Sequence, residues 1–125
     1  MKNIVHLILA LLFYFSVPAQ STDSLKTITG KVVSVQSGNL LTVQDGKAKY
    51  LIKIAGIYVP SFSFRKESTE SLSKIAKNKD VLLKVLRIEK IENKEVFVAQ
   101  ASILKKDIAL EQISLGMALI SSELK

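Results

Sequence analysis

The stretch that decides the fold is GKVVSVQSGNLLTVQDGKAKYLIKIAGIYVP, residues 30–60. It contains three apolar runs, separated by Ser37-Gly38-Asn39 and by Asp45-Gly46, and both separators are typical of tight turns. The first run alternates in part between apolar and polar residues and is rich in β-branched side chains, as expected of a strand with one solvated face. The sequence therefore predicts a three-stranded meander over residues 27–36, 40–44 and 48–57, which Pro60 closes because proline cannot donate to a strand ladder.

The order of residues also predicts which faces of these strands are buried. In the first strand, Ile28, Val33 and Val35 are expected to share the apolar face. The segment 51–57 carries Lys53 as its only charged residue, so we expect both of its faces to be covered.

Beyond residue 60 the pattern changes to a helix and then returns to strands. A helical period over residues 64–78 places Phe64 on the apolar stripe with Leu72, Ile75 and Ala76, so we expect Phe64 in the core. Two strands follow over residues 81–88 and 95–104, with the charged residues 89–94 as their connection. A short last helix over residues 108–115 is expected to be capped by Asp107 and ended by Gly116.

This order of elements predicts one fold class. Three strands, a helix, two strands and a helix indicate a mainly β protein with α-helices (α+β), arranged as a five-stranded antiparallel OB-type Greek-key barrel. Barrel closure is expected because it removes the edges that an open five-stranded meander would expose.

The amino terminus has the features of a leader. Met1-Lys2-Asn3 is a short basic start, an apolar run follows, and Val17-Pro18-Ala19 offers the small residues of a cleavage site. We expect a signal peptide at residues 1–19, a flexible lead-in at 20–26, a domain at 27–120 and a polar tail at 121–125. The protein is then exported, to the periplasm or the extracellular space. The alternative is an uncleaved anchor.

Charge and composition narrow the possible functions. The 125-residue chain has a formal net charge of +7, and removal of Lys2 with the leader leaves +6 (7 minus 1). A basic surface favours anionic partners without naming one. The chain has no cysteine, and its only histidine, His6, lies in the leader. These facts exclude thiolate and histidine metal sites and Cys-His or Ser-His catalysis from the mature chain.

Four segments in this order, GKVVSVQSGNLLTVQDG, YLIKIAGIYVP, EVFVAQASI and IALEQISLGMALI, resemble the thermonuclease family of staphylococcal-nuclease-like domains. The resemblance covers residues 27–120, and residue types typical of the family recur at Gly30, Gly38, Gly56, Pro60, Ala99, Gly116 and Ala118. It implies an OB-type barrel. It also implies phosphodiester hydrolysis with one calcium ion, a glutamate acting through water and two arginines that clamp the phosphate.

The residues that would carry this chemistry are replaced. Carried over position by position, the metal positions fall on Asn39, Tyr58 and Val59, the glutamate on Ser61, and the two arginines on Lys53 and Val96. Calcium takes most of its affinity from carboxylates, so we expect no calcium and no other cofactor. Lysine is a point charge without the planar fork of arginine, and valine offers nothing to a phosphate. The expectation is a degenerate, inactive nuclease-like hydrolase.

Binding is therefore the expected function, with nucleic acid, another polyanion or a protein as the partner. The site residues expected for it are Lys53, Tyr58, Phe62, Lys47 and Lys49, and the further cations Lys31, Arg65 and Lys66 are candidates for the same basic face. Two alternatives stay open. One is a calcium-dependent phosphodiesterase with atypical site residues, and the other is a structural accessory domain of the cell envelope.

Overall fold

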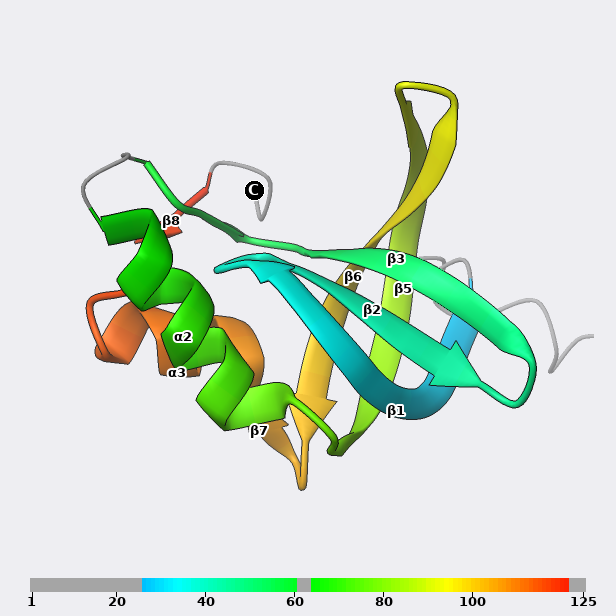
Figure 1. Ribbon diagram of the computed structural model, residues 1–125, viewed down its shortest axis with the longest axis horizontal. Coiled ribbons are helices and arrows are strands. Elements are labelled where there is room, and N and C mark those ends of the chain that lie inside the picture. The colour runs from blue at the N-terminus through cyan, green and yellow to red at the C-terminus, as the bar shows by residue number, and fades with distance from the viewer. Residues whose placement is uncertain (1–25, 61–63, 122–125) are drawn as a thin grey trace, which may run out of the picture.

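The computed structural model describes residues 26–60 and 64–121. The leader, most of the lead-in, Ser61, Phe62 and the tail from residue 122 lie outside the described residues. The elements are β1 Lys26–Ser37, β2 Leu40–Asp45, β3 Ala48–Ile54, β4 Ile57–Tyr58, α2 Arg65–Ala76, β5 Asp80–Ile91, β6 Lys94–Ile103, β7 Lys106–Asp107, α3 Ile108–Ser114 and β8 Leu119–Ile120 (Figure 1).

Five of these strands close into a barrel. They are neighbours in the order β3-β2-β1-β5-β6, and β3 pairs with β6 to complete the circle. The predicted fold class is confirmed: the described residues form a mainly β structure with a closed five-stranded OB-type barrel and, within those residues, two helices, one after the third long strand and one that follows β7. The barrel is mixed, however, because the closing β3–β6 pair is parallel, from Leu51↔Val96 to Ile54↔Ala99.

Aliphatic side chains fill the barrel. In β1 and in β3, the burial of individual residues differs from the sequence expectations. In β1 the interior residue is Val32, which is fully buried and alternates in step with Ile28, and Val33 is only half-buried. The register with β2 then shifts between Val32 and Ser34, and Val35 packs against the core again. The shift is a β-bulge, which changes the face on which later residues lie. In segment 51–57 the expected cover on both faces is met in part: Ile52 and Ile54 are buried, and Leu51 and Lys53, on the other face of β3, are half-buried.

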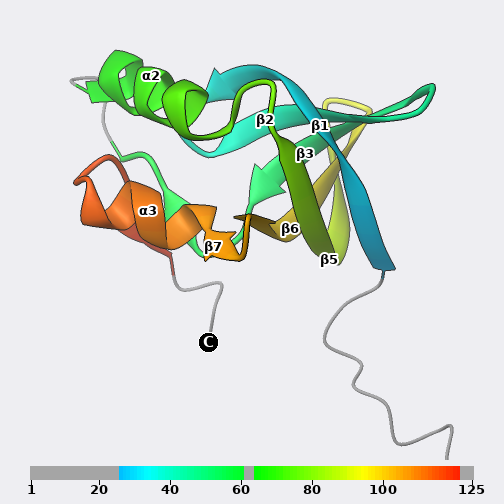
Figure 2. The same cartoon turned by 90° about the horizontal axis from the view of Figure 1, so that it is seen from below.

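The two helices lie together at one end of the barrel, opposite the β2–β3 turn, as Figures 1 and 2 both show. Helix α2 is shorter than predicted at both ends, and Phe64 is its half-buried N-cap residue, outside the core cluster. The predicted ends of helix α3 are confirmed. The Leu110 N–H donates to the Asp107 carboxylate at 3.2 Å, and Gly116 follows the helix at φ 73°.

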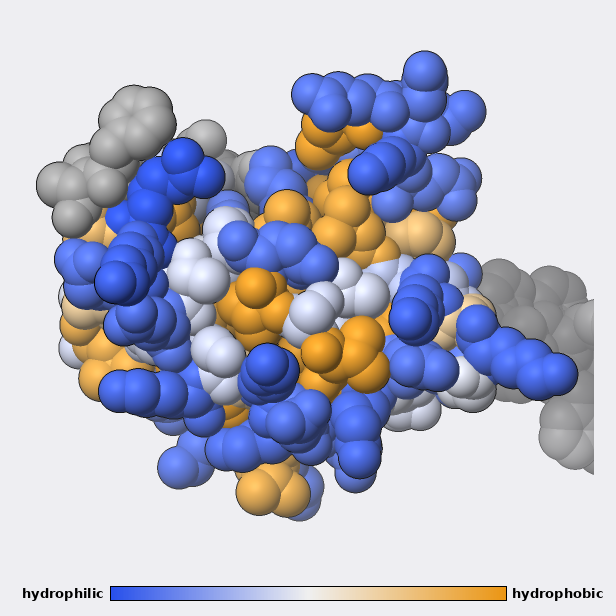
Figure 3. All heavy atoms as spheres, in the orientation of Figure 1, coloured by the Kyte–Doolittle hydropathy of each residue, from blue (hydrophilic) through white to orange (hydrophobic). Residues whose placement is uncertain are grey.

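The β5–β6 hairpin projects from the barrel (Figure 1). We expected its connection at residues 89–94, and this was wrong: β5 continues to Ile91, β6 begins at Lys94, and Glu92 and Asn93 alone form the turn, with φ of 52° and 66°. Charged residues are tolerated in these strands because much of the hairpin is exposed. Figure 3 shows apolar atoms at its surface between hydrophilic ones, and Ile91 is 47% exposed.

None of the helices within residues 26–60 and 64–121 is long and apolar enough to cross a membrane.

A buried polar network joins the helices to the β1–β2 turn. Gln112 of α3 and Ser68 of α2 are both fully buried. The Gln112 side-chain amide donates to the Gly38 carbonyl at 3.0 Å and to the Ser68 carbonyl at 3.2 Å, and its own carbonyl oxygen accepts from the Ser71 hydroxyl at 2.6 Å. The Ser68 hydroxyl donates to the Met117 carbonyl at 2.7 Å. One glutamine thus connects the barrel to both helices.

We expect Gln112→Leu to lower the free energy of unfolding by about 3 kcal/mol, because a leucine of similar size leaves buried polar partners unsatisfied. Urea unfolding followed by circular dichroism measures this. The matched control is Gln100→Leu on the exposed face of β6, for which a change within about 0.5 kcal/mol is expected. Equal losses in the two variants would contradict a role for the network.

Candidate functional site

A cleft opens where the β1–β2 turn, the end of β3, the segment after β4 and the start of α2 meet. It encloses about 360 Å³. Its lining residues are Ser37, Gly38, Asn39, Lys53, Tyr58, Val59, Pro60 and Arg65. The described lining therefore contains two cations, one aromatic ring and several polar groups, and it contains no carboxylate.

Local hydrogen bonds orient the polar wall of the cleft. The Ser37 hydroxyl donates to Asn39 Oδ1 at 2.9 Å, and the Ile54 N–H donates to the Asn39 carbonyl at 2.8 Å. The second bond ties the turn to the end of β3, beside Lys53. Asn39 Oδ1 uses one of its two lone pairs in this bond, and the Asn39 side-chain NH₂ group offers N–H donors to a ligand. A donor of this kind favours an anion over a cation.

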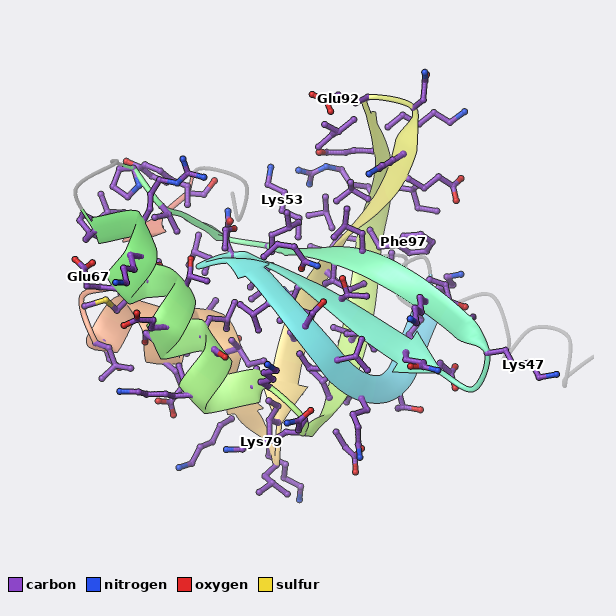
Figure 4. The ribbon with its side chains drawn as sticks, viewed as in Figure 1. Lys47, Lys53, Glu67, Lys79, Glu92 and Phe97 are labelled. Atoms are coloured by element: carbon purple, nitrogen blue, oxygen red, sulfur yellow. The ribbon has the colours of Figure 1, made fainter. Side chains whose placement is uncertain are left out.

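The two cations reach the cleft from different elements. Lys53 lies on the outer face of β3, opposite Leu40 of β2. Arg65 is the first residue of α2, so the partially positive end of that helix lies at the rim of the cleft. Figure 4 shows Lys53 on the side of the barrel toward which the hairpin with Glu92 projects. Both side chains and the helix end contribute positive potential to the same hollow.

Tyr58 forms the aromatic wall. It belongs to β4, which pairs with β8 and sets Tyr58 opposite Leu119. Tyr58 is 44% exposed and Leu119 is 48% exposed, so an apolar strip adjoins the cations. An exposed ring of this kind can stack against a base or pack against an apolar side chain of a partner.

The structure brings together only part of the predicted site. Asn39, Lys53, Tyr58 and Val59 all line the cleft, and Arg65, named only as a possible member of a basic face, joins them. Lys47 and Lys49 lie at the β2–β3 turn, at the far end of the barrel from the cleft (Figure 4). Val96 is 3% exposed in the barrel wall, opposite Leu51, and Ser61 and Phe62 lie outside the described residues.

The residues present do not fit the calcium ion that the family resemblance implies. Calcium requires several oxygen ligands, carboxylates above all. The three metal positions offer an amide whose oxygen binds Ser37, a phenol and a valine, and Lys53 and Arg65 line the same hollow. Within the described ranges, no group of three or more acidic, histidine or cysteine side chains is placed to hold a metal ion.

We compared the sequence with protein-family models and with curated proteins, and it matches none of them.

The sequence did not predict how the β1–β2 turn, which lines the cleft, is packed against α2. A side chain at Gly38 would place its Cβ 1.7 Å from the Ser68 hydroxyl oxygen and 2.8 Å from a Val59 methyl group, distances that no real contact allows. Glycine is therefore required for the close approach of the turn to α2. The signal in the sequence was Ser68 itself, which stands four residues from Phe64 and from Leu72 on the apolar stripe of the helix.

We expect Gly38→Ala to lower the free energy of unfolding by about 3 kcal/mol, because the new methyl group forces the turn away from α2. Urea unfolding measures the loss. The control is Gly46→Asn in the β2–β3 turn, where an added Cβ meets nothing within 4 Å and asparagine tolerates the positive φ. A change within about 0.5 kcal/mol is expected there. A well-tolerated alanine at residue 38 would disprove the close packing.

Proposed function

We propose that this protein is an exported binding module whose cleft takes the phosphate backbone of single-stranded nucleic acid, and that it does not hydrolyse phosphodiesters. The observation that carries the proposal is the content of the cleft: Lys53, Arg65 and the Asn39 amide converge on one hollow whose described lining has no carboxylate. The leader at residues 1–19 supports export, to the periplasm or the extracellular space.

The proposed mode of binding is electrostatic contact combined with stacking. Arg65 has the planar fork that binds two phosphate oxygens, and Lys53 adds a second point of positive charge. The Tyr58 side chain is 44% exposed, and any of the bases can stack on its ring. Contacts to the phosphate and to any base give affinity without sequence readout. We therefore propose a ligand class, single-stranded polyanions, and no preferred sequence.

A protein partner is the second candidate, and one observation favours it. The β4–β8 pair exposes Leu119 and Ile120, at 48% and 69%, beside Tyr58. Exposed apolar side chains that gather at a cleft are typical of a surface that contacts another protein. The two candidates differ in their response to salt, because polyanion binding weakens steeply with ionic strength and apolar contacts do not.

We expect the mature protein to bind a fluorescent oligothymidylate with an affinity that falls steeply as salt rises. Lys53→Gln and Arg65→Gln should each weaken binding about 5-fold and flatten the salt dependence by roughly one phosphate contact. Fluorescence anisotropy over a salt series measures both quantities. The protein's circular dichroism spectrum should stay unchanged in both variants.

Lys47→Gln and Lys49→Gln are the matched controls, since they remove the same charge away from the cleft: Lys47 lies in the β2–β3 turn (Figure 4), and Lys49 is the second residue of β3, beside that turn. We expect less than a 2-fold effect from each. If all four variants weaken binding equally, the cleft is not the site and the attraction is a diffuse property of a basic protein. Absence of binding by the wild-type protein would reject the nucleic-acid proposal and leave the protein partner or a structural role in the envelope.

The calcium-dependent phosphodiesterase is tested separately. We expect no chelator-sensitive cleavage of single-stranded DNA by the purified protein, because loss of one electrostatic stabiliser alone costs about 100-fold or more in rate and here several are replaced together. Gel analysis of a labelled oligonucleotide with calcium, and with calcium plus chelator, measures the activity. Robust cleavage that the chelator abolishes and Lys53→Gln reduces would overturn this part of the proposal.

A further inference from the structure

Arg87 of β5 lies in the outer face of the barrel, two strands from Lys53 of the cleft. In the β5–β6 pair, Val98 lies opposite Arg87 and Val96 lies opposite Glu89. Directly opposite residues point to the same face of a sheet. Arg87 is therefore on the same face as Val96, at the diagonal position, which is within reach of a long side chain.

The parallel β3–β6 pair, which closes the barrel, connects Arg87 through Val98 to Lys53 of the cleft. Lys53 of β3 lies opposite Val98 of β6, and Val98 lies opposite Arg87 of β5. The row Lys53–Val98–Arg87 thus crosses three strands on the outer face, and two strand spacings separate its cations by about 10 Å. Val98 is uncharged and fully buried, so the row presents positive charge at both of its ends.

A β-bulge at Leu86 sets this arrangement. The register between β5 and β6 shifts between Val85 and Arg87, so that Leu86 is the extra residue. Val85 faces the core, and strict alternation would have put Arg87 inward with it. The extra residue turns Arg87 to the outer face. The bulge therefore brings the guanidinium to the face that carries Lys53.

Glu89 holds Arg87 in place. The Arg87 Nε donates to the Glu89 carboxylate at 2.8 Å, and the two side chains are 41% and 31% exposed. The carboxylate also competes with any anion for the same charge. An ion pair at this exposure is weak enough for a phosphate to exchange with the carboxylate.

We propose that Arg87 is a second phosphate-binding residue, which continues the cleft across β6 so that one single strand contacts Arg65, Lys53 and Arg87 in turn. This inference rests on the proposed function, because it names a further contact for the same ligand. It adds a length requirement. A ligand of two nucleotides occupies the cleft alone, and only a longer strand reaches Arg87.

The experiment compares oligothymidylates of about 2 to 16 nucleotides, a range that includes the site sizes of roughly 4 to 16 nucleotides usual for barrels of this type. Arg87→Gln should bind the shortest ligand as the wild-type protein does and bind the longest about 5-fold more weakly, with a smaller salt dependence. Glu89→Gln should do the opposite and strengthen binding of the longest ligand alone, because it removes the competing carboxylate. The double variant should behave as Arg87→Gln does.

Lys90→Gln is the matched control. Lys90 lies on the same hairpin, and it points to the other face because it alternates with Glu89 along β5. It should leave the length dependence unchanged. Thermal unfolding of all variants tests whether the hairpin keeps its fold.

The outcomes separate the two proposals. Suppose that the wild-type protein binds, and that Arg87→Gln binds every length with the same affinity as the wild type or Lys90→Gln loses as much affinity as Arg87→Gln. The cleft then remains the proposed binding site, and the role of Arg87 is rejected. If Arg87→Gln weakens ligands of all lengths equally, the residue acts through the structure of the hairpin and this inference is wrong. If the wild-type protein binds no oligonucleotide, the proposed function fails and this inference fails with it.

Discussion

The contact between the β1–β2 turn and the two helices is the constraint on which the cleft depends. Gly38 lies so close to Ser68 that no side chain fits between them, and Gln112 binds the Gly38 carbonyl from a position 74 residues further along the chain. The turn is thereby fixed against both α2 and α3. Since Asn39 follows in the same turn and Arg65 begins α2, this contact also sets the two sides of the cleft at their distance from each other.

The barrel determines the rest of the charge distribution through its closing pair. A parallel β3–β6 ladder brings Lys53 beside Val98, and the antiparallel β5–β6 ladder brings Val98 beside Arg87. Register shifts at two places in β1 and at one place in β5 change the face on which the following residues lie. Charges that are scattered along the sequence thus gather on one outer face.

The same barrel supports different chemistry according to the residues at one end of it. Asn39, Tyr58 and Val59 occupy positions at which the family resemblance implies metal ligands, and they leave a cleft that is basic and partly apolar. A donor amide, two cations and an exposed ring suit an anion or a partner surface and do not suit a divalent cation. The side chains of Asn39, Tyr58 and Val59 lie outside the core cluster, so the charge and polarity of the cleft do not depend on the packing of the barrel.

The sequence by itself determined the order of the five long strands and the two helices, the turns at Gly38 and Gly46, the ends of α3 and the OB-type class, since these follow from local turn chemistry, capping and hydrophobic period. The family resemblance also predicted that Asn39, Lys53, Tyr58 and Val59 lie near one another, and all four line the cleft. Only the tertiary structure decided the parallel closing pair, the burial of Ser68 and Gln112, the length of the hairpin and the outward direction of Arg87. Those features depend on register shifts and on contacts between residues far apart in the chain, and a single bulge inverts the face that strict alternation predicts.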